Sequence, residues 1–180
     1  GGGTLGSVPE DTLNPAGALL SALNISVTDV DASSTAVGYA IVGNAASSEQ
    51  GVWQYSTNGT TWKPIGSVND GANALALSAS TRIRFVPASN YNGTPGALTI
   101  RALDNTYIGR FSSTSEASEA RVLVNTTTRG NASAISAATS TISTSITAVN
   151  DAPVLGGGGT LPSVLEDTSD PEGELLSALN

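Results

Sequence analysis

The sequence predicts an all-β protein that folds as an antiparallel β-sandwich. Short stretches in which apolar and polar residues alternate recur along the chain, and this period of two residues is typical of strands with one buried face. Clusters of Gly, Asn, Asp, Ser and Pro separate these stretches at the spacing that sandwiches show. Helical periodicity is weak, so strands joined by turns are expected to build the core.

The end of the chain repeats its beginning. Residues 4–24 read TLGSVPEDTLNPAGALLSALN and residues 160–180 read TLPSVLEDTSDPEGELLSALN, which gives 15 identities in 21 positions at an offset of 156 residues. This period indicates an array of domains, because solenoid repeats are only about 20–50 residues long. We therefore expect a complete repeat with long loops over 1–155, a glycine-rich linker over 156–159 and the start of the next repeat over 160–180.

The first elements precede an expected hairpin. Residues 17–24 are too few for an independently stable helix and are expected to form one turn of helix or an irregular strand. Alternating runs at 24–28 and 36–42 are expected strands. In the first of these, Ile25 and Val27 would share one face.

A β-hairpin is expected within residues 51–61. Its Asn58-Gly59 pair suits a type I′ turn, in which both central residues have positive φ. The hairpin would bring Trp53 or Tyr55 close to Trp62. Exposed together, these rings would form a platform that stacks on sugars, whereas buried rings would cap the core, because large aromatic side chains dominate core burial.

The rest of the unit alternates strands with long loops. Arg82 and Arg84 alternate with an apolar residue, which predicts a strand with a solvent-exposed face. Residues 105–118 and 126–138 show little pattern and are expected to be surface loops. The strands expected here are 74–77, 82–86, 97–103, 120–124 and 139–149.

Composition argues against several classes of function. The chain has no Cys, His or Met, so it has neither disulfides nor thiolate metal sites and lacks the commonest general base. Its net charge of −8 disfavours a nucleic-acid partner, and no apolar run approaches the roughly 20 residues of a membrane span. The paired carboxylates Asp29 and Asp31 lie two residues apart with no other catalytic partner, so we do not expect an enzyme.

The carboxylates gather in short motifs near the ends of expected strands. Ca²⁺ takes several oxygen ligands from carboxylates, Asn side chains and backbone carbonyls, so these motifs predict calcium sites. An ordinary turn is the alternative for each motif, because Asp, Asn and Pro favour turns. The candidate ligands are Glu10, Asp11, Asp29, Asp31, Asp104, Asn150 and Asp151.

Several stretches of the unit carry motifs of one known family. VTDVDASSTAVGYAI (27–41) looks like the Asp-x-Asp segment of cadherin repeats, and SITAVNDAPV (145–154) is similar to their closing strand and linker. FVPASNYNGTPGALTIRALDN (85–105) resembles the bacterial cadherin-like version and includes LTIRALDN (98–105), which resembles a later strand ending in Ala-x-Asp. The chain thus resembles a cadherin-like repeat of giant bacterial surface proteins and adhesins.

The resemblance implies a seven-stranded Greek-key sandwich, joined end to end with its neighbours and stiffened by Ca²⁺ at the junctions. Such a chain would be extracellular, at a bacterial cell surface, where it extends or assembles an adhesin stalk or fibre. Its partners would be neighbouring repeats of the same chain or identical subunits. In this arrangement one end of the domain would carry Asp29, Asp31 and Asp104, and the other end Glu10, Asn150 and Asp151.

Two alternatives to the calcium-stiffened array are open. One is a glycan-binding module that uses the Trp53, Tyr55 and Trp62 rings. The other follows from residues 160–180, which have no core of their own. Either they result from a cut through a longer polypeptide, or they dock on a neighbouring unit in a filament built by donor-strand exchange. The docking residues would be Leu161, Val164, Leu175 and Leu176.

Overall fold

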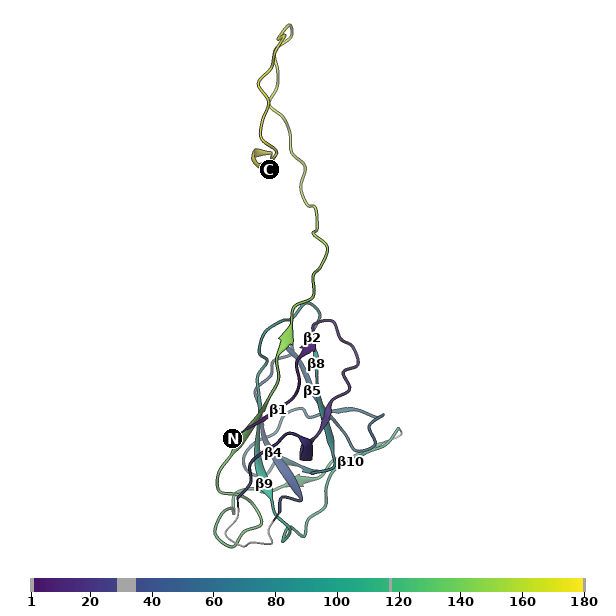
Figure 1. Ribbon diagram of the computed structural model, residues 1–180, viewed down its shortest axis with the longest axis vertical. Helices are drawn as coiled ribbons and strands as arrows, with labels where there is room; N and C mark the ends of the chain where they lie inside the picture. The colour runs from purple at the N-terminus through teal and green to yellow at the C-terminus, as the bar shows by residue number, and fades with distance from the viewer. Residues whose placement is uncertain (1, 29–34, 117, 180) are drawn as a thin grey trace. The chain divides into compact units, whose positions relative to one another are not determined.

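A computed structural model describes residues 2–28, 35–116 and 118–179 of the chain (Figure 1). The chain divides into two units, Gly1–Val149 and Asn150–Asn180. In the first unit the described elements are strands and one short 3-10 helix, so the all-β prediction is confirmed. The described residues of the second unit contain one 3-10 helix, η2 (Leu176–Ala178).

The larger sheet of the first unit has six strands in the order β1-β13-β9-β4-β7-β12. Neighbouring strands run antiparallel except at one edge, where β1 runs parallel to β13. The first strand of the domain is thereby paired with one of its last. The strands are β1 (Gly3–Thr4), β4 (Gly38–Asn44), β7 (Ala74–Ser78), β9 (Leu98–Leu103), β12 (Leu123–Val124) and β13 (Ser140–Ser143).

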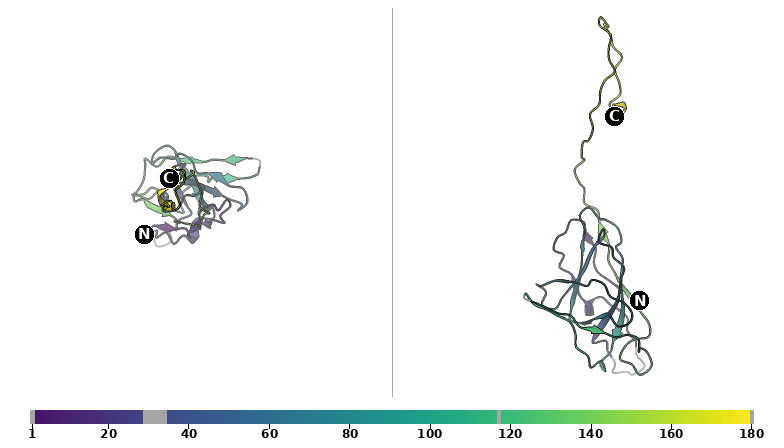
Figure 2. Two further views of the ribbon diagram at one scale, coloured as in Figure 1. Left: turned by 90° about the horizontal axis from the view of Figure 1, so that it is seen from above. Right: turned by 180° about the vertical axis from the view of Figure 1, so that it is seen from behind.

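The second sheet has four antiparallel strands in the order β3-β8-β5-β6. A parallel pair, β2 with β14, continues the contact between the start and the end of the domain. The β10–β11 hairpin projects from the side of the unit (Figure 2). These strands are β2 (Val8–Pro9), β3 (Ala18–Leu19), β5 (Gly51–Ser56), β6 (Lys63–Pro64), β8 (Arg82–Pro87), β10 (Ser113–Thr114), β11 (Glu119–Ala120) and β14 (Ile146–Thr147).

The two sheets share one apolar core. Strand β5 buries alternate residues, and Trp53 packs edge-on against Phe85 of β8 with ring centroids 5.2 Å apart. This alternation explains why the period of two residues located the strands. The larger sheet contributes Tyr39, Ile41, Leu75, Leu77, Leu98, Ile100 and Ile142 to the same core cluster, and the second sheet contributes Trp53, Tyr55, Ile83 and Phe85.

Most expected strands of the first unit are confirmed, with two kinds of error. The strands expected at 36–42, 74–77, 82–86 and 97–103 are β4, β7, β8 and β9. The stretch 17–24 forms both of its expected alternatives, since β3 runs directly into the 3-10 helix η1 (Leu20–Ala22).

The strand expected at 24–28 is absent, because that stretch pairs with no other strand. The stretches 120–124 and 139–149 are each broken in two. Their halves pair with different partners: β11 with β10, β12 with β7, β13 with β9 and β14 with β2.

The hairpin expected within 51–61 forms between β5 and β6, but its turn is not of type I′. Six residues separate the two strands, and Asn58 is not among the residues with positive φ, whereas Gly59 has φ +77°. The Asn58 side chain takes over the turn instead. Its Oδ1 accepts hydrogen bonds from the amides of Thr60 and Thr61 at 3.0 and 2.8 Å.

The stretch 126–138 and the connection that carries Asp70 are tied to the sheet by one carboxylate. Arg101 of β9 donates two hydrogen bonds to Asp70, at 2.9 and 2.6 Å, and another to the carbonyl of Ser136 at 3.0 Å. Thr126 Oγ1 donates to the same carboxylate at 2.8 Å. Residues 126–138 are therefore anchored, and their Ile135 is buried against the second core cluster rather than lying in a surface loop.

The hydrogen bonds that Asp70 accepts from Arg101 and Thr126 should make the free energy of unfolding depend on pH. Hydrogen bonds from Arg101 and then Thr126 hold the pKa of Asp70 below its ordinary value, against the opposing effect of burial. Its contribution is therefore present above the ordinary carboxyl pKa of about 4 and is lost as pH falls through the lower folded value. We expect Asp70→Asn to unfold at lower urea concentration at pH 7, with the gap to the unaltered chain narrowing below pH of about 4. A gap that stays constant to pH 2 would contradict this account.

Candidate functional site

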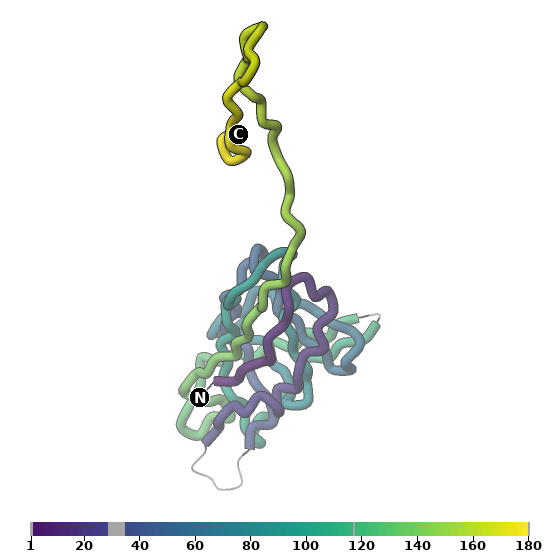
Figure 3. The backbone as a smooth tube through the Cα atoms, turned by 45° about the horizontal axis from the view of Figure 1, so that its top comes forward, coloured from purple at the N-terminus to yellow at the C-terminus, as the bar shows by residue number. Residues whose placement is uncertain are grey.

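The repeated part of the sequence, residues 2–23, forms a structural unit that we name the N-terminal segment. It begins as β1 and β2 beside the last strands of the domain (Figure 3). The Leu5 amide donates to the Ser143 carbonyl at 2.9 Å, and the Glu10 amide donates to that of Thr147 at 2.9 Å. The segment thus covers an edge that would otherwise expose unpaired backbone groups.

Glu10 closes this pairing at the end of the domain. Its carboxylate is buried, and Oε1 accepts a 2.6 Å hydrogen bond from the amide of Val149, 139 residues away in the sequence. Oε2 accepts a second bond from Asn92 Nδ2 at 3.2 Å. Asp11, with φ +62°, accepts a bond from the Asn90 amide at 3.0 Å. Two candidate calcium ligands therefore have protein donors as partners.

Arg84 of β8 holds the middle of the N-terminal segment. It is only 7% exposed, which contradicts the expectation of a solvent-exposed face for Arg84, and its guanidinium lies 4.1 Å from the centre of the Trp62 ring. It donates to the Pro15 carbonyl at 3.1 Å and also to Asn14 Oδ1. Burial lowers the pKa of Arg84, but these acceptors satisfy the buried donors.

Apolar residues of the segment complete the core of the first unit. Leu5, Leu20 and Leu23 are at most 5% exposed and belong to the main core cluster. Gly17, with φ +64°, lies against the Ile83 backbone where a side chain would collide. The N-terminal segment is therefore part of the fold and not a flexible arm.

Three of the remaining candidate calcium ligands, Asp104, Asn150 and Asp151, lie among the described residues. Asp29 and Asp31 lie outside the described residues. Asp104 accepts bonds from the Thr106 amide and hydroxyl at 2.7 and 2.6 Å, as in an ordinary turn. In the second unit, the Asn150 side chain donates to the Asp151 carbonyl at 3.2 Å.

Within the described ranges, no three His, Cys, Asp or Glu side chains gather as a metal site would require. Calcium binding stays a prediction from the sequence.

The aromatic residues do not form an exposed platform. Trp53 and Tyr55 are fully buried, and their polar atoms are bonded to the Gly96 carbonyl at 2.8 Å and to Glu119 at 2.5 Å. Burial, followed by the bond to Glu119, raises the pKa of the Tyr55 phenol. Of the two predicted alternatives for Trp53 and Tyr55, burial in the core is therefore confirmed. Trp62 is half-buried and lies over Arg84.

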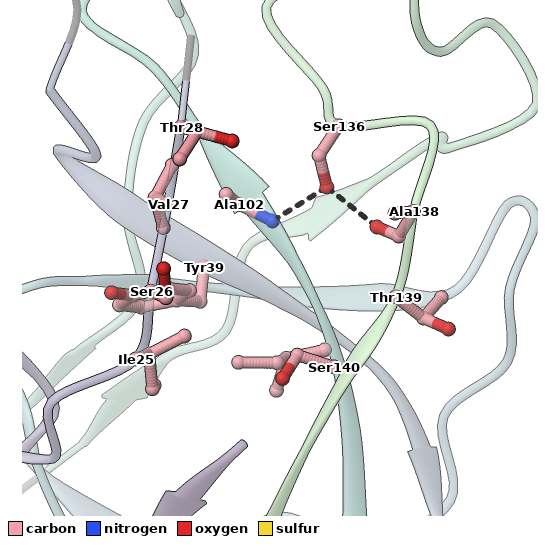
Figure 4. Close-up of a pocket in the computed structure, with 11 residues that line it drawn as sticks. Ile25, Ser26, Val27, Thr28, Tyr39, Ala102, Ser136, Ala138, Thr139 and Ser140 are labelled. Atoms are coloured by element: carbon pink, nitrogen blue, oxygen red, sulfur yellow. Dashed lines mark hydrogen bonds between the residues drawn. The ribbon is translucent and has the colours of Figure 1, made fainter. Parts of the chain in front are cut away.

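A hollow of about 250 Å³ lies where residues 25–28 face β4, β9 and the stretch 136–140 (Figure 4). Its described lining has no charged side chain. The Ser136 hydroxyl accepts a bond from the Ala102 amide at 3.0 Å and donates to the Ala138 carbonyl at 2.8 Å. The Ser136 hydroxyl therefore bonds backbone groups at the rim of the hollow.

Comparisons of the chain with protein families, with curated proteins and with solved structures found no match. Across the described residues, no helix has the length and apolar character needed to cross a membrane. The structure itself therefore carries the functional argument. The site that it defines is the groove on β13, β14 and β8 in which the N-terminal segment lies.

The two copies of the repeated sequence offer a matched test of this docking. Leu20 is fully buried, whereas Leu176, its equivalent, is 89% exposed. We expect Leu20→Ala to lower the free energy of unfolding by about 2–5 kcal/mol, because it leaves a cavity. Leu176→Ala should change it by less than about 0.5 kcal/mol. Urea unfolding of both variants measures the difference, and equal effects would refute the docking.

Glu10 and Glu166 provide a polar counterpart of that test. Glu10→Gln replaces an acceptor oxygen by an amide that cannot accept from both Val149 and Asn92, so we expect a loss of about 1–3 kcal/mol. Glu166→Gln is the control, because Glu166 is exposed. If thermal unfolding shows no difference between the two variants, the Glu10 contacts do not stabilise the fold.

Proposed function

We propose that the chain is a structural repeat of an extracellular bacterial surface protein, which extends or assembles a stalk or fibre. The observation that carries the proposal is the recurrence of the N-terminal segment 156 residues later. A domain whose first segment completes its own core, followed by a second copy of that segment, is the pattern of a tandem array. The further absence of Cys and His favours a mechanical rather than a catalytic role.

Local backbone geometry supports the recurrence. Asp11 and Asp167 both have positive φ, at 62° and 71°. Leu19 and Leu175 precede the 3-10 helices η1 and η2 with nearly the same dihedral angles, φ −67° and ψ 140° against φ −66° and ψ 137°. Equal turns at equal offsets favour a second copy of the same fold over a chance likeness of sequence.

We infer that the first unit is a Greek-key sandwich of the cadherin-like class. Three pairings support this inference: β3 with β8 in one sheet, β4 with β9 in the other, and the first strands parallel to the last. Such a domain starts at one end of its sandwich and finishes at the other, which suits it to end-to-end arrays. The strand β7 beside β4 and the β10–β11 hairpin add residues to the unit.

A tandem chain tests the array directly. Residues 1–180 followed by residues 25–180 should form two folded domains, the second of which begins with residues 158–180, and small-angle scattering should show a particle longer than the single chain. Residues 158–179 at the junction should then become protected from proteolysis, because the second domain buries them. If protease cleaves residues 158–179 as readily in the tandem chain as in the single chain, the proposal is wrong.

Calcium at the junctions is part of the proposal and rests on the Asn-Asp motif at 150–151 and the other acidic motifs. We expect the tandem chain to melt at higher temperature in Ca²⁺ than in EDTA, because an ion that binds only the folded state stabilises it. Asp151→Asn should reduce this rise. Identical melting temperatures in Ca²⁺ and in EDTA would show that the carboxylates are ordinary turn residues.

A further inference from the structure

Residues 158–179 are the second copy of the repeated sequence, and we name them the C-terminal segment. They preserve the residues that are buried in the first copy. It differs from residues 2–23 at six of 22 positions. Five of these differences fall where the N-terminal segment is exposed, and the sixth falls at the half-buried Ala18. All buried positions are identical in the two copies: Gly3 and Gly159, Leu5 and Leu161, Glu10 and Glu166, Pro15 and Pro171, Leu20 and Leu176, and Leu23 and Leu179.

Two of the differences at exposed positions are compatible with the same groove. Pro162 replaces Gly6, whose carbonyl accepts a bond from Thr144 Oγ1 at 3.0 Å and whose position has open space for a side chain. Asp170 replaces Asn14, so a carboxylate would face the Arg84 guanidinium in place of an amide oxygen. Both exchanges keep the acceptor that the groove uses.

One difference opposes docking. Ala18 pairs with Ile83 in the second sheet and packs against the core, whereas its equivalent is Glu174. A carboxylate at this half-buried position would have to reach solvent or lose hydration. The C-terminal segment should therefore bind the groove more weakly than the N-terminal segment does.

The C-terminal segment already has the local shape that docking requires. Beyond its turns, it repeats a close approach between its two ends: Gly3 lies against Leu23, and Gly159 lies against Leu179. Its apolar side chains have no comparable cover, since Leu161 is 62% and Leu176 is 89% exposed, against 5% and 0% for Leu5 and Leu20. A preformed segment with exposed anchors loses less conformational entropy on binding than an unstructured one.

We propose that residues 158–179 of one chain dock in the groove of a second copy of the chain, in the place of that copy's residues 2–23. The partner's own segment is tethered beside the groove at an effective concentration on the order of millimolar, so it normally wins. Exchange dominates when that segment is weakened or displaced. This inference names a partner for the proposed array, but its tests use the single chain, so either can fail alone.

Rescue of a damaged N-terminal segment tests the exchange. Leu20→Asp places a charge in the core, so this chain should be unfolded when dilute and regain β-structure as concentration rises, forming dimers and larger species. The double variant Leu20→Asp/Leu176→Asp should stay unfolded, because both segments are then damaged. Adding Glu174→Ala to Leu20→Asp should lower the concentration of half-folding several-fold. Equal behaviour of the single and double variants in circular dichroism and light scattering would overturn the proposal.

Disulfide trapping tests the register in a chain that keeps its own segment. Thr4 faces Ser143 across the β1–β13 pair, so exchange would place Thr160 of another chain opposite Ser143. Because the sequence has no Cys, Ser143→Cys/Thr160→Cys introduces the only two thiols of each chain. Oxidation of a concentrated sample should give reducible covalent dimers and larger species, whereas Ser143→Cys/Thr168→Cys should give far fewer. Equal yields, or a cross-link confined to monomers, would refute docking on a second copy.

Discussion

The structure depends on the parallel contact between the first residues of the domain and its last strands. Without β1 and β2, strands β13 and β14 would have open backbone groups, and the core would lose Leu5, Leu20 and Leu23. The buried carboxylate of Glu10 closes this contact by bonding the amide of Val149 at the point where the first unit ends. Because an acceptor with two protein donors is costly to lose in a buried site, this contact holds together residues that are far apart in sequence.

That constraint also explains where the two copies of the sequence agree. The groove selects an apolar side chain at Leu5 and Leu20, a carboxylate at Glu10 and a residue without a side chain at Gly3, and it leaves exposed positions free. Residues 158–179 follow the same selection although Leu161, Glu166 and Leu176 are exposed. The simplest physical reason is that they bind in a groove of the same kind, either in the following repeat or in a second copy of the chain. In either case the proposed fibre would be joined by pieces of the fold itself and not only by linkers.

Sequence reasoning succeeded where one local pattern decides the structure and failed where a distant partner decides it. Strands β4, β8 and β9 follow from alternation, because each is paired on both sides and sends every second residue into the main core cluster. The run at 24–28 alternates equally well but meets no strand, and no local signal reveals this. Arg84 suggested an exposed face, because a pattern of charge does not show that Asn14 and Pro15 supply acceptors. The acidic motifs were predicted as calcium sites, with ordinary turns as the alternative. The donors to Glu10 and Asp11 come from residues 90, 92 and 149, which only the tertiary fold brings close.

Native-state hydrogen exchange of the single chain in dilute solution measures the central claim most directly. The amides of Leu5, Val8 and Glu10 bond to carbonyls of the last strands, whereas in the described part of the C-terminal segment the equivalent amides of Leu161, Val164 and Glu166 have no such backbone acceptor. The account predicts that the first three exchange only with opening of the whole domain, and that their equivalents exchange orders of magnitude faster. Rapid exchange at Leu5, Val8 and Glu10 would show that the N-terminal segment does not close the fold, and the account would be wrong.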